Sequence, residues 1–487
     1  MKTQSIKKNY IYNLIYNLSS LLAPLLIAPY LSRILGVSGV GIKSYTLSIV
    51  SNFIIFASLG IAEYGQREIA INRDNIYERS KKLYEIGILR IVTTSIITTI
   101  YIIMFVFTTF NNSYNVIYAI LLINIIANML DFSWYLQGIE EFKFISITQI
   151  ITRIVMVVLT FTCVRKESDL NIAILINSTV LLLNAIIPLR LVAKNIQKVQ
   201  IKNLHPFKHF KQCVVYFIPA IATQIYTVLD KTMIGVITNS AYENGYYEQA
   251  DKMLKLIITL ITTANIVMKS RISYLFSQRK IEEIKNLISN SLHMTLILAW
   301  PVAMGVAAIS SVIVPVFFGI GYEKTIPLLI ILSPLAIIIG ISNLLGTHYL
   351  TPSGRRGKSN IGLIIGACIN FILNILLIKS LNSIGAAISS VIAEMVITII
   401  YIKLSKDIIS IKDIIKASCK YCISSIIMFI LIIILKHQMQ TSVQTLAILI
   451  AMGVIIYGGT LLVLKDKFVY DGIEQIKERI RKIGKNV

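Results

Sequence analysis

The sequence has few acidic residues and little charge of any kind. Charged residues make up 15% of the 487 positions, and 24 Asp and Glu stand against 47 Lys and Arg, which gives a formal charge of +23. Such a basic balance can indicate nucleic-acid binding, but no polar stretch of domain size is present to form a nucleic-acid module. The cations lie beside apolar stretches, where membrane lipid accounts for them. We therefore expect no nucleic acid among the partners.

The sequence also has few cysteines and no complete phosphate-binding motif. Of five cysteines, only Cys419 and Cys422 have CxxC spacing, and no second pair or histidine cluster accompanies them, so the pattern indicates packing rather than metal or redox chemistry. Residues 357–359 (Gly-Lys-Ser) end like a phosphate-binding loop, but Pro352 occupies the position that requires the preceding glycine. We expect no metal, no cofactor and no ATPase activity.

Long apolar runs are what the sequence has in abundance. A helix needs about 20 apolar residues to cross a bilayer, and fourteen stretches meet this length. They lie near 11–31, 40–62, 83–107, 115–136, 145–165, 170–193, 213–236, 245–268, 288–313, 325–348, 359–378, 382–402, 414–435 and 443–463.

The basic residues alternate between the gaps. Of the 47, 35 lie in or beside the two tails and every second loop, seven in or beside the other loops, and five deeper inside the spans. Cytoplasmic loops are enriched in Lys and Arg, so both termini are predicted to be cytoplasmic. The fold class predicted is an all-α membrane protein with about 14 transmembrane helices.

A weak internal repeat suggests how these helices are organised. Spans one and two and spans seven and eight share an order of residues, namely Pro24, Gly36, Gly41 and Tyr45 against Pro219, Gly235, Gly245 and Tyr246. Both sets begin on the same side, so the repeat is parallel. The prediction is two six-helix lobes followed by two extra helices, with an N-terminal lobe at 1–194, a C-terminal lobe at 195–403, two additional spans at 404–464 and a basic amphipathic cytoplasmic tail at 465–487.

The loops separate classes of membrane protein. Those predicted outside hold roughly ten residues or fewer, such as 166–169 and 237–244, which leaves little room for an enzyme that polymerises sugars there. A many-span chain without extramembrane domains is typical of a secondary transporter.

The end of the fourth span carries a motif. From Asp131 to Glu140 the chain reads D-F-S-W-Y-L-Q-G-I-E, which resembles the D-x-x-W-[YF]-x-Q-G-x-E signature of bacterial polysaccharide (O-antigen and capsule) flippases. The turn at Gly36 and the stretch that begins at Asp230 resemble further motifs of the wider multidrug, lipid-oligosaccharide and polysaccharide exporter superfamily.

The resemblance implies a transporter in the bacterial cell membrane. Its substrate would be an undecaprenyl-pyrophosphate-linked oligosaccharide, carried from the inner to the outer leaflet for surface polysaccharide assembly. Polysaccharide polymerase and glycosyltransferases would act beside it. Two alternatives stay open: an exporter of drugs or peptidoglycan precursor from the same superfamily, and a membrane-embedded polysaccharide polymerase.

A pyrophosphate requires cations inside the membrane, where an ionised side chain is costly. The five candidates are Arg90, Arg153, Lys231, Lys252 and Lys255. The arginines lie about 10 to 12 Å inside the cytoplasmic ends of spans three and five, and the lysines in the outer half of spans seven and eight.

Local pairing is the competing interpretation of these cations. Asp230 neighbours Lys231, Glu248 and Asp251 stand at helical spacing from Lys252 and Lys255, and Asp131 is within reach of an arginine in the first lobe. Glu394, in span twelve, is either a site for a coupling ion or another partner.

Polar side chains at helical spacing predict which helices line the cavity. The candidates are Asn13 and Asn17 on span one, and Thr223 and Thr227 on span seven. Helix-to-helix hydrogen bonds are the alternative. Trp134 is expected to anchor its helix at the lipid interface.

Overall fold

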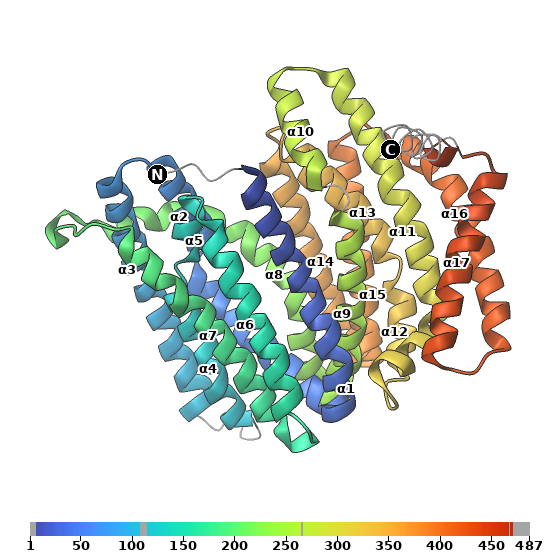
Figure 1. The fold of residues 1–487 in the computed structure, drawn as a ribbon, viewed down its shortest axis with the longest axis horizontal. Helices are drawn as coiled ribbons and strands as arrows, with labels where there is room; N and C mark the ends of the chain where they lie inside the picture. Colours follow the sequence, from blue (N-terminus) through green and yellow to red (C-terminus); the bar gives the residue numbers. More distant parts are fainter. Residues whose placement is uncertain (1–5, 108–113, 264–265, 467, 471–487) are drawn as a thin grey trace, which may run out of the picture. The chain divides into compact units, whose positions relative to one another are not determined.

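The computed structural model describes the chain except residues 1–5, 108–113, 264–265, 467 and 471–487, and every regular element in the described part is helical. In lipid, backbone groups find partners only within a helix or a closed barrel, so long apolar stretches become helices. The chain divides into two compact units, unit 1 (Met1–Glu248) and unit 2 (Gln249–Val487) (Figure 1).

Unit 1 is a helical bundle in which α1 packs against α3, α4, α6 and α8, and α4 packs against α7. Its core between α1, α3 and α4 is aromatic, with Phe53, Tyr101, Phe105 and Tyr118 in edge-on or tilted contact. The elements are α1 (Ile6–Ser58), α2 (Ile61–Ile71), α3 (Ile76–Ile102), a π-helical turn η1 (Ile103–Phe107), α4 (Asn115–Leu130), α5 (Ser133–Gly138), α6 (Phe142–Cys163), η3 (Glu167–Asp169), α7 (Leu170–Lys194), η4 (Ile201–Asn203), η5 (Pro206–His209), α8 (Phe210–Thr238) and the start of α9 (Ala241–Thr263).

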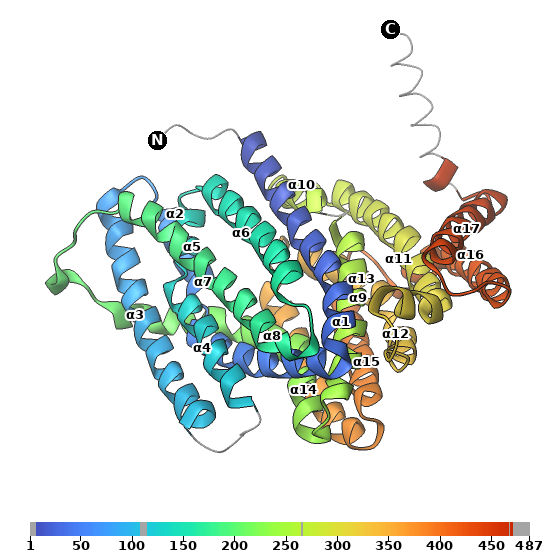
Figure 2. The ribbon, with the colours of Figure 1, turned by 60° about the horizontal axis from the view of Figure 1, so that its bottom comes forward.

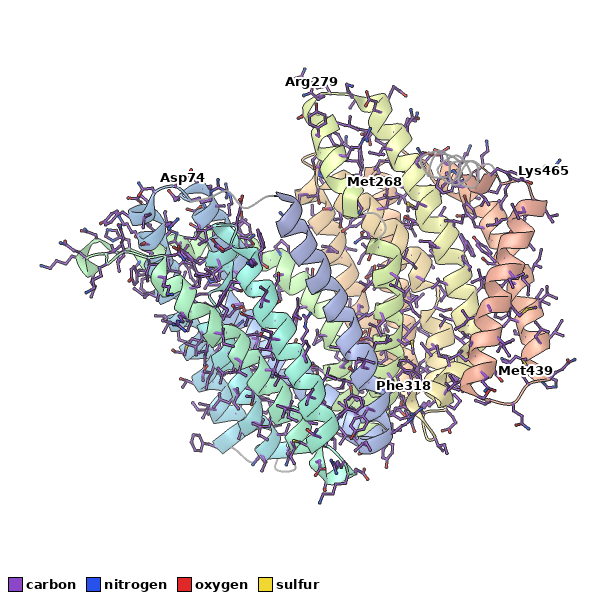
Figure 3. The ribbon with its side chains drawn as sticks, in the orientation of Figure 1. Asp74, Met268, Arg279, Phe318, Met439 and Lys465 are labelled. Carbon is purple, nitrogen blue, oxygen red and sulfur yellow. The ribbon has the colours of Figure 1, made fainter. Side chains whose placement is uncertain are left out.

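Unit 2 is built around α11, which packs against α12, α13, α16 and α17, while α14 pairs with α15. Figure 3 shows that Arg279 and Lys465 lie at one end of unit 2, and Phe318 and Met439 at the other. The elements after α9 are α10 (Ile266–Ser277), α11 (Ile281–Phe318), α12 (Thr325–Leu332), α13 (Leu335–Asn343), π-helical η6 (Leu344–Leu350), α14 (Arg356–Leu381), α15 (Ser383–Leu404), α16 (Ile411–His437) and α17 (Val443–Val463).

The described residues contain eleven helices long and apolar enough to cross a membrane, or up to twelve if a bent pair around α8 is one span. The chain is therefore an all-α, multi-pass membrane protein, as predicted. The count of 14 and the arrangement in lobes, with divisions at 194, 403 and 464, stay predictions.

Two elements account for much of the difference in number. The first two predicted spans together form α1, in which two helices meet at a kink at Gly36 with no loop between them. Gly36 has φ 64° and ψ −178°, a conformation open essentially to glycine. The predicted eighth span, α9, carries five charged side chains between Glu243 and Lys255, so it is too polar to count among the apolar membrane-crossing helices.

Candidate functional site

Arg90 lies inside the bundle of unit 1 and is 2% exposed. Its Nε donates to the carbonyl oxygen of Asn128 at 2.8 Å, and its Nη2 donates to the same oxygen. Asn128 is in the last turn of α4, where carbonyls lack helical partners and a cation is favourable. The carboxylates of Asp131 and Glu63 are close enough to interact with the guanidinium. Arg90 thus joins α3 to the end of α4.

The motif that begins at Asp131 forms a packing surface. Asp131 accepts a hydrogen bond from the Ser133 amide at 2.9 Å, which turns the chain into α5. Trp134 is 1% exposed and lies directly against Gly65 of α2, where any side chain would overlap the indole. The expectation that Trp134 anchors the helix at the lipid interface is therefore wrong.

The rest of the motif fixes neighbouring elements. The Tyr135 hydroxyl donates to the carbonyl of Asn195 at 2.7 Å, just after α7. Glu140 forms an ion pair with Arg73 Nη1 at 2.8 Å, in the turn between α2 and α3. The motif therefore holds α5 against α2 and the end of α7.

Lys231 belongs to a polar cluster among α1, α8 and α9. Its Nζ lies 2.6 Å from Oε2 of Glu248, and the Ser44 hydroxyl donates to that same oxygen at 2.8 Å. The side chains of Lys231 and Glu248 are each 15% exposed. The neighbouring Asp230 accepts a hydrogen bond from the Tyr247 hydroxyl at 2.6 Å. Adjacent residues on a helix point in different directions, so the two charges meet different partners.

Two glycines near this cluster bring α1 and the start of α9 into close contact. A Cβ on Gly41 would overlap the Ala241 carbonyl, and one on Gly245 would overlap the Val37 carbonyl. The two halves of the predicted repeat thus meet backbone to backbone, which only glycine permits. Beside this contact lies a cavity of about 180 Å³, lined by Ile42, Tyr45, Tyr114, Gly235, Asn239, Ser240, Ala241 and Asn244.

The other two lysines lie on α9 in unit 2. Lys255 forms an ion pair with Asp251 one turn earlier at 2.8 Å, which confirms that predicted partner. Lys252 is half-buried. Glu248, the other predicted partner of these lysines, contacts Lys231 on α8.

The remaining candidates are dispersed. Arg153 is half-buried on α6, and Glu394 is half-buried on α15. Thr223 and Thr227 donate to the carbonyls of Pro219 and Thr223, four residues earlier, at 3.0 and 2.8 Å. Asn13 and Asn17 belong to α1, but their side chains lie outside the described residues.

A cluster around one buried carboxylate was not among the candidates predicted from the sequence. Glu85 on α3 is fully buried and accepts hydrogen bonds from Lys208 Nζ at 2.8 Å and His209 Nε2 at 2.9 Å. The other ring nitrogen of His209 lies 2.6 Å from the Tyr64 hydroxyl on α2. The signal for this cluster is an acidic residue inside the apolar stretch 83–107; its partners are more than 120 positions away in the sequence.

Unit 2 also contains a hydrogen-bonded cluster around one carboxylate, beside η6. Arg355 makes two hydrogen bonds to Asp407, at 2.9 and 2.7 Å, and a third to the Leu404 carbonyl at the end of α15 at 3.0 Å. The Tyr349 hydroxyl donates to Asp407 at 2.6 Å. Arg355 holds the pKa of Asp407, which lies between α15 and α16, below its ordinary value.

Known proteins resemble this chain over most of its length. A putative O-antigen transporter of Escherichia coli (strain K12) is 25% identical over 397 residues, which cover 81% of this chain and 95% of the relative. The capsular polysaccharide biosynthesis protein CapF of Staphylococcus aureus is 22% identical over 398 residues, covering 81% and 98%.

A solved structure has the same fold. The lipid II flippase MurJ, in an inward closed conformation, superposes with a TM-score of 0.72 at 20% identity, covering 96% of this chain and 99% of that one. The polysaccharide biosynthesis protein family matches residues 6–276, more than half of the sequence. The resemblance indicated by the motif at Asp131 is thereby confirmed, and the chain belongs to the polysaccharide biosynthesis protein family.

Proposed function

We propose that the protein is a flippase that moves undecaprenyl-pyrophosphate-linked oligosaccharide units from the inner to the outer leaflet of the bacterial cell membrane. The observation that carries the proposal is the cluster of Lys231, Glu248 and Ser44 inside the bundle. Ionised groups at membrane depth are retained mainly where they bind a substrate, an ion or one another. Family membership and the names of the relatives support the same class of activity.

The contacts of Lys231 suggest how it is used. While Gly41 and Gly245 allow α1 to pack closely against the start of α9, the ammonium of Lys231 is paired with the carboxylate of Glu248. If this end of the bundle opens, Ser44 moves away from Glu248, the pair weakens, and Lys231 becomes available to phosphate oxygens. Lys252 and Lys255 follow Glu248 on α9 and are proposed to share this task.

Arg90 and Arg153 are proposed to meet the pyrophosphate first, from the cytoplasmic side. A guanidinium binds phosphate through two parallel hydrogen bonds, whereas an ammonium acts as a point charge. Arg90 already presents such a pair of donors to the carbonyl of Asn128. Its part in entry therefore requires the end of α4 to shift and release it, and the phosphates would replace the carbonyl. Glu394 remains a candidate for a coupling ion.

Deletion of the gene tests the proposal against its alternatives. We expect the lipid-linked glycan to remain on the inner leaflet, inaccessible to a membrane-impermeant sugar-oxidising reagent added to spheroplasts. Glycan that reaches the outside without elongation would establish the polymerase alternative instead. Accumulation of peptidoglycan precursor on the inner leaflet, with surface polysaccharide unchanged, would establish the exporter alternative.

A further inference from the structure

The segment between α7 and α8 projects from unit 1. Residues 196–208, here called the arm, run sideways across the helix axes in both views (Figures 1 and 2) and include the short η4 and η5 turns. The arm lies at the same end of unit 1 as Asp74, in the turn between α2 and α3 (Figure 3). This is the end predicted to be cytoplasmic.

The base of the arm is fixed on both sides. Where the arm leaves α7, the carbonyl of Asn195 accepts hydrogen bonds from Arg79 at 3.2 Å and Tyr135 at 2.7 Å. The amide of Gln197 donates to the Ser80 hydroxyl at 2.9 Å. Where the arm returns, the His205 amide, Lys208 and His209 bind Glu85. The tip is therefore presented in a defined position.

The outward side of the arm is apolar and basic together. Ile201 is 83% exposed and Phe207 is 68% exposed, unfavourable positions for such side chains in water. Lys198 and Lys202 are exposed beside them, and residues 195–212 contain four lysines but no Asp or Glu. Exposed apolar side chains flanked by lysines are typical of segments that lie in a membrane surface.

We propose that the arm binds the surface of an anionic phospholipid leaflet. Ile201 and Phe207 enter the boundary between headgroups and acyl chains, and Lys198 and Lys202 contact lipid phosphates. Because the segment has lysines and no acidic residues, it is attracted to a negatively charged lipid surface and has no charge that would bind a basic surface. Because the arm joins α7 to α8, bound lipid would hold the start of α8 at the level of the leaflet surface.

Hydrogen exchange of the full chain in lipid nanodiscs tests this binding without reference to transport. The tip amides of Asn203 and Leu204 donate to Gln200 and Ile201 at 3.0 and 3.1 Å, so their exchange reports opening of the η4 turn. We expect slower exchange in nanodiscs that contain phosphatidylglycerol than in phosphatidylcholine alone. Each lysine near an anionic surface favours the bound state by about fivefold.

The matched variants separate arm charge from total charge. Lys198→Glu with Lys202→Glu should remove the protection gained from anionic lipid, a loss of at least about 25-fold in the bound population. The control, Lys285→Glu with Lys412→Glu, changes two exposed lysines on α11 and α16 and should leave the protection intact. Ile201→Ser should weaken protection in both lipids. Unchanged exchange in α4 and α7 verifies that the variants fold.

Two outcomes would overturn the inference. Equal exchange of the arm in the two lipid compositions would show that it does not bind anionic lipid. Protection that depends on protein concentration in detergent, and not on lipid charge, would assign the arm to contact with a second copy of the chain.

Discussion

Removing one partner of the Lys231 and Glu248 pair should destabilise unit 1 strongly. Both side chains are 15% exposed and lie 2.6 Å apart, so Glu248→Ala leaves a largely buried ammonium without the carboxylate that it contacts. Breaking such a pair costs about 3 to 5 kcal/mol. For a unit of 248 residues, about 3 kcal/mol corresponds to a fall in Tm of roughly 6 to 12 °C.

The double variant Lys231→Met, Glu248→Leu removes both charges and should recover most of this loss. The remaining cost is the Ser44 hydroxyl, which loses its acceptor in Glu248, about 1 kcal/mol. Thermal unfolding in nanodiscs, together with surface polysaccharide in a complemented deletion strain, gives both readouts. We expect the double variant to be stable but unable to export.

Two results would refute this reasoning. A double variant as unstable as Glu248→Ala would show that the pair is not the source of the stability. A stable double variant that exports at the wild-type rate would show that Lys231 does not serve the substrate.

Four further predictions follow from other contacts. Gly245→Val should reduce export without reducing the amount of protein in the membrane, because its side chain would separate α9 from Val37; cysteine crosslinking across that contact would measure the separation. Arg90→Ala and Arg153→Ala should abolish export in a vesicle assay, and Arg→Lys should restore only part of it; wild-type export by the double alanine variant would contradict the phosphate role. The stabilisation from Asp407, whose pKa is lowered by Arg355, should be present at neutral pH and disappear as the pH falls below about 4; denaturation of Asp407→Asn should lack this acid-dependent component. A C-terminal alkaline phosphatase fusion should be inactive, because that enzyme folds only outside the cytoplasm.

The helical class and the positions of most spans were predictable because the bilayer allows a single solution to an apolar run of this length. The partners of the buried charges were not. Arg90 binds the backbone carbonyl of Asn128, and a backbone acceptor leaves no trace in the sequence. The pair of Asp251 and Lys255, one helical turn apart, does follow from spacing.

The packing of the motif that begins at Asp131 could not be predicted from the sequence either. Its residues identify the family, but their packing depends on residues distant in the sequence, such as Gly65, whose missing side chain leaves room for Trp134. Glu85 and His209 are likewise 124 positions apart. Long-range contacts of this kind arise only when the helices assemble.

The single break at Gly36 has a consequence for biogenesis. The two apolar halves of α1 share one uninterrupted chain with no polar loop between them, so neither half has a free end that could wait at the translocation channel. The two must partition into lipid together, as a helical hairpin. Of the charged residues between positions 9 and 62, which are Arg33 and Lys43, both must cross the membrane with the bend. An epitope tag inserted after Gly36 would therefore block insertion of both halves, whereas a tag between α16 and α17 would be tolerated.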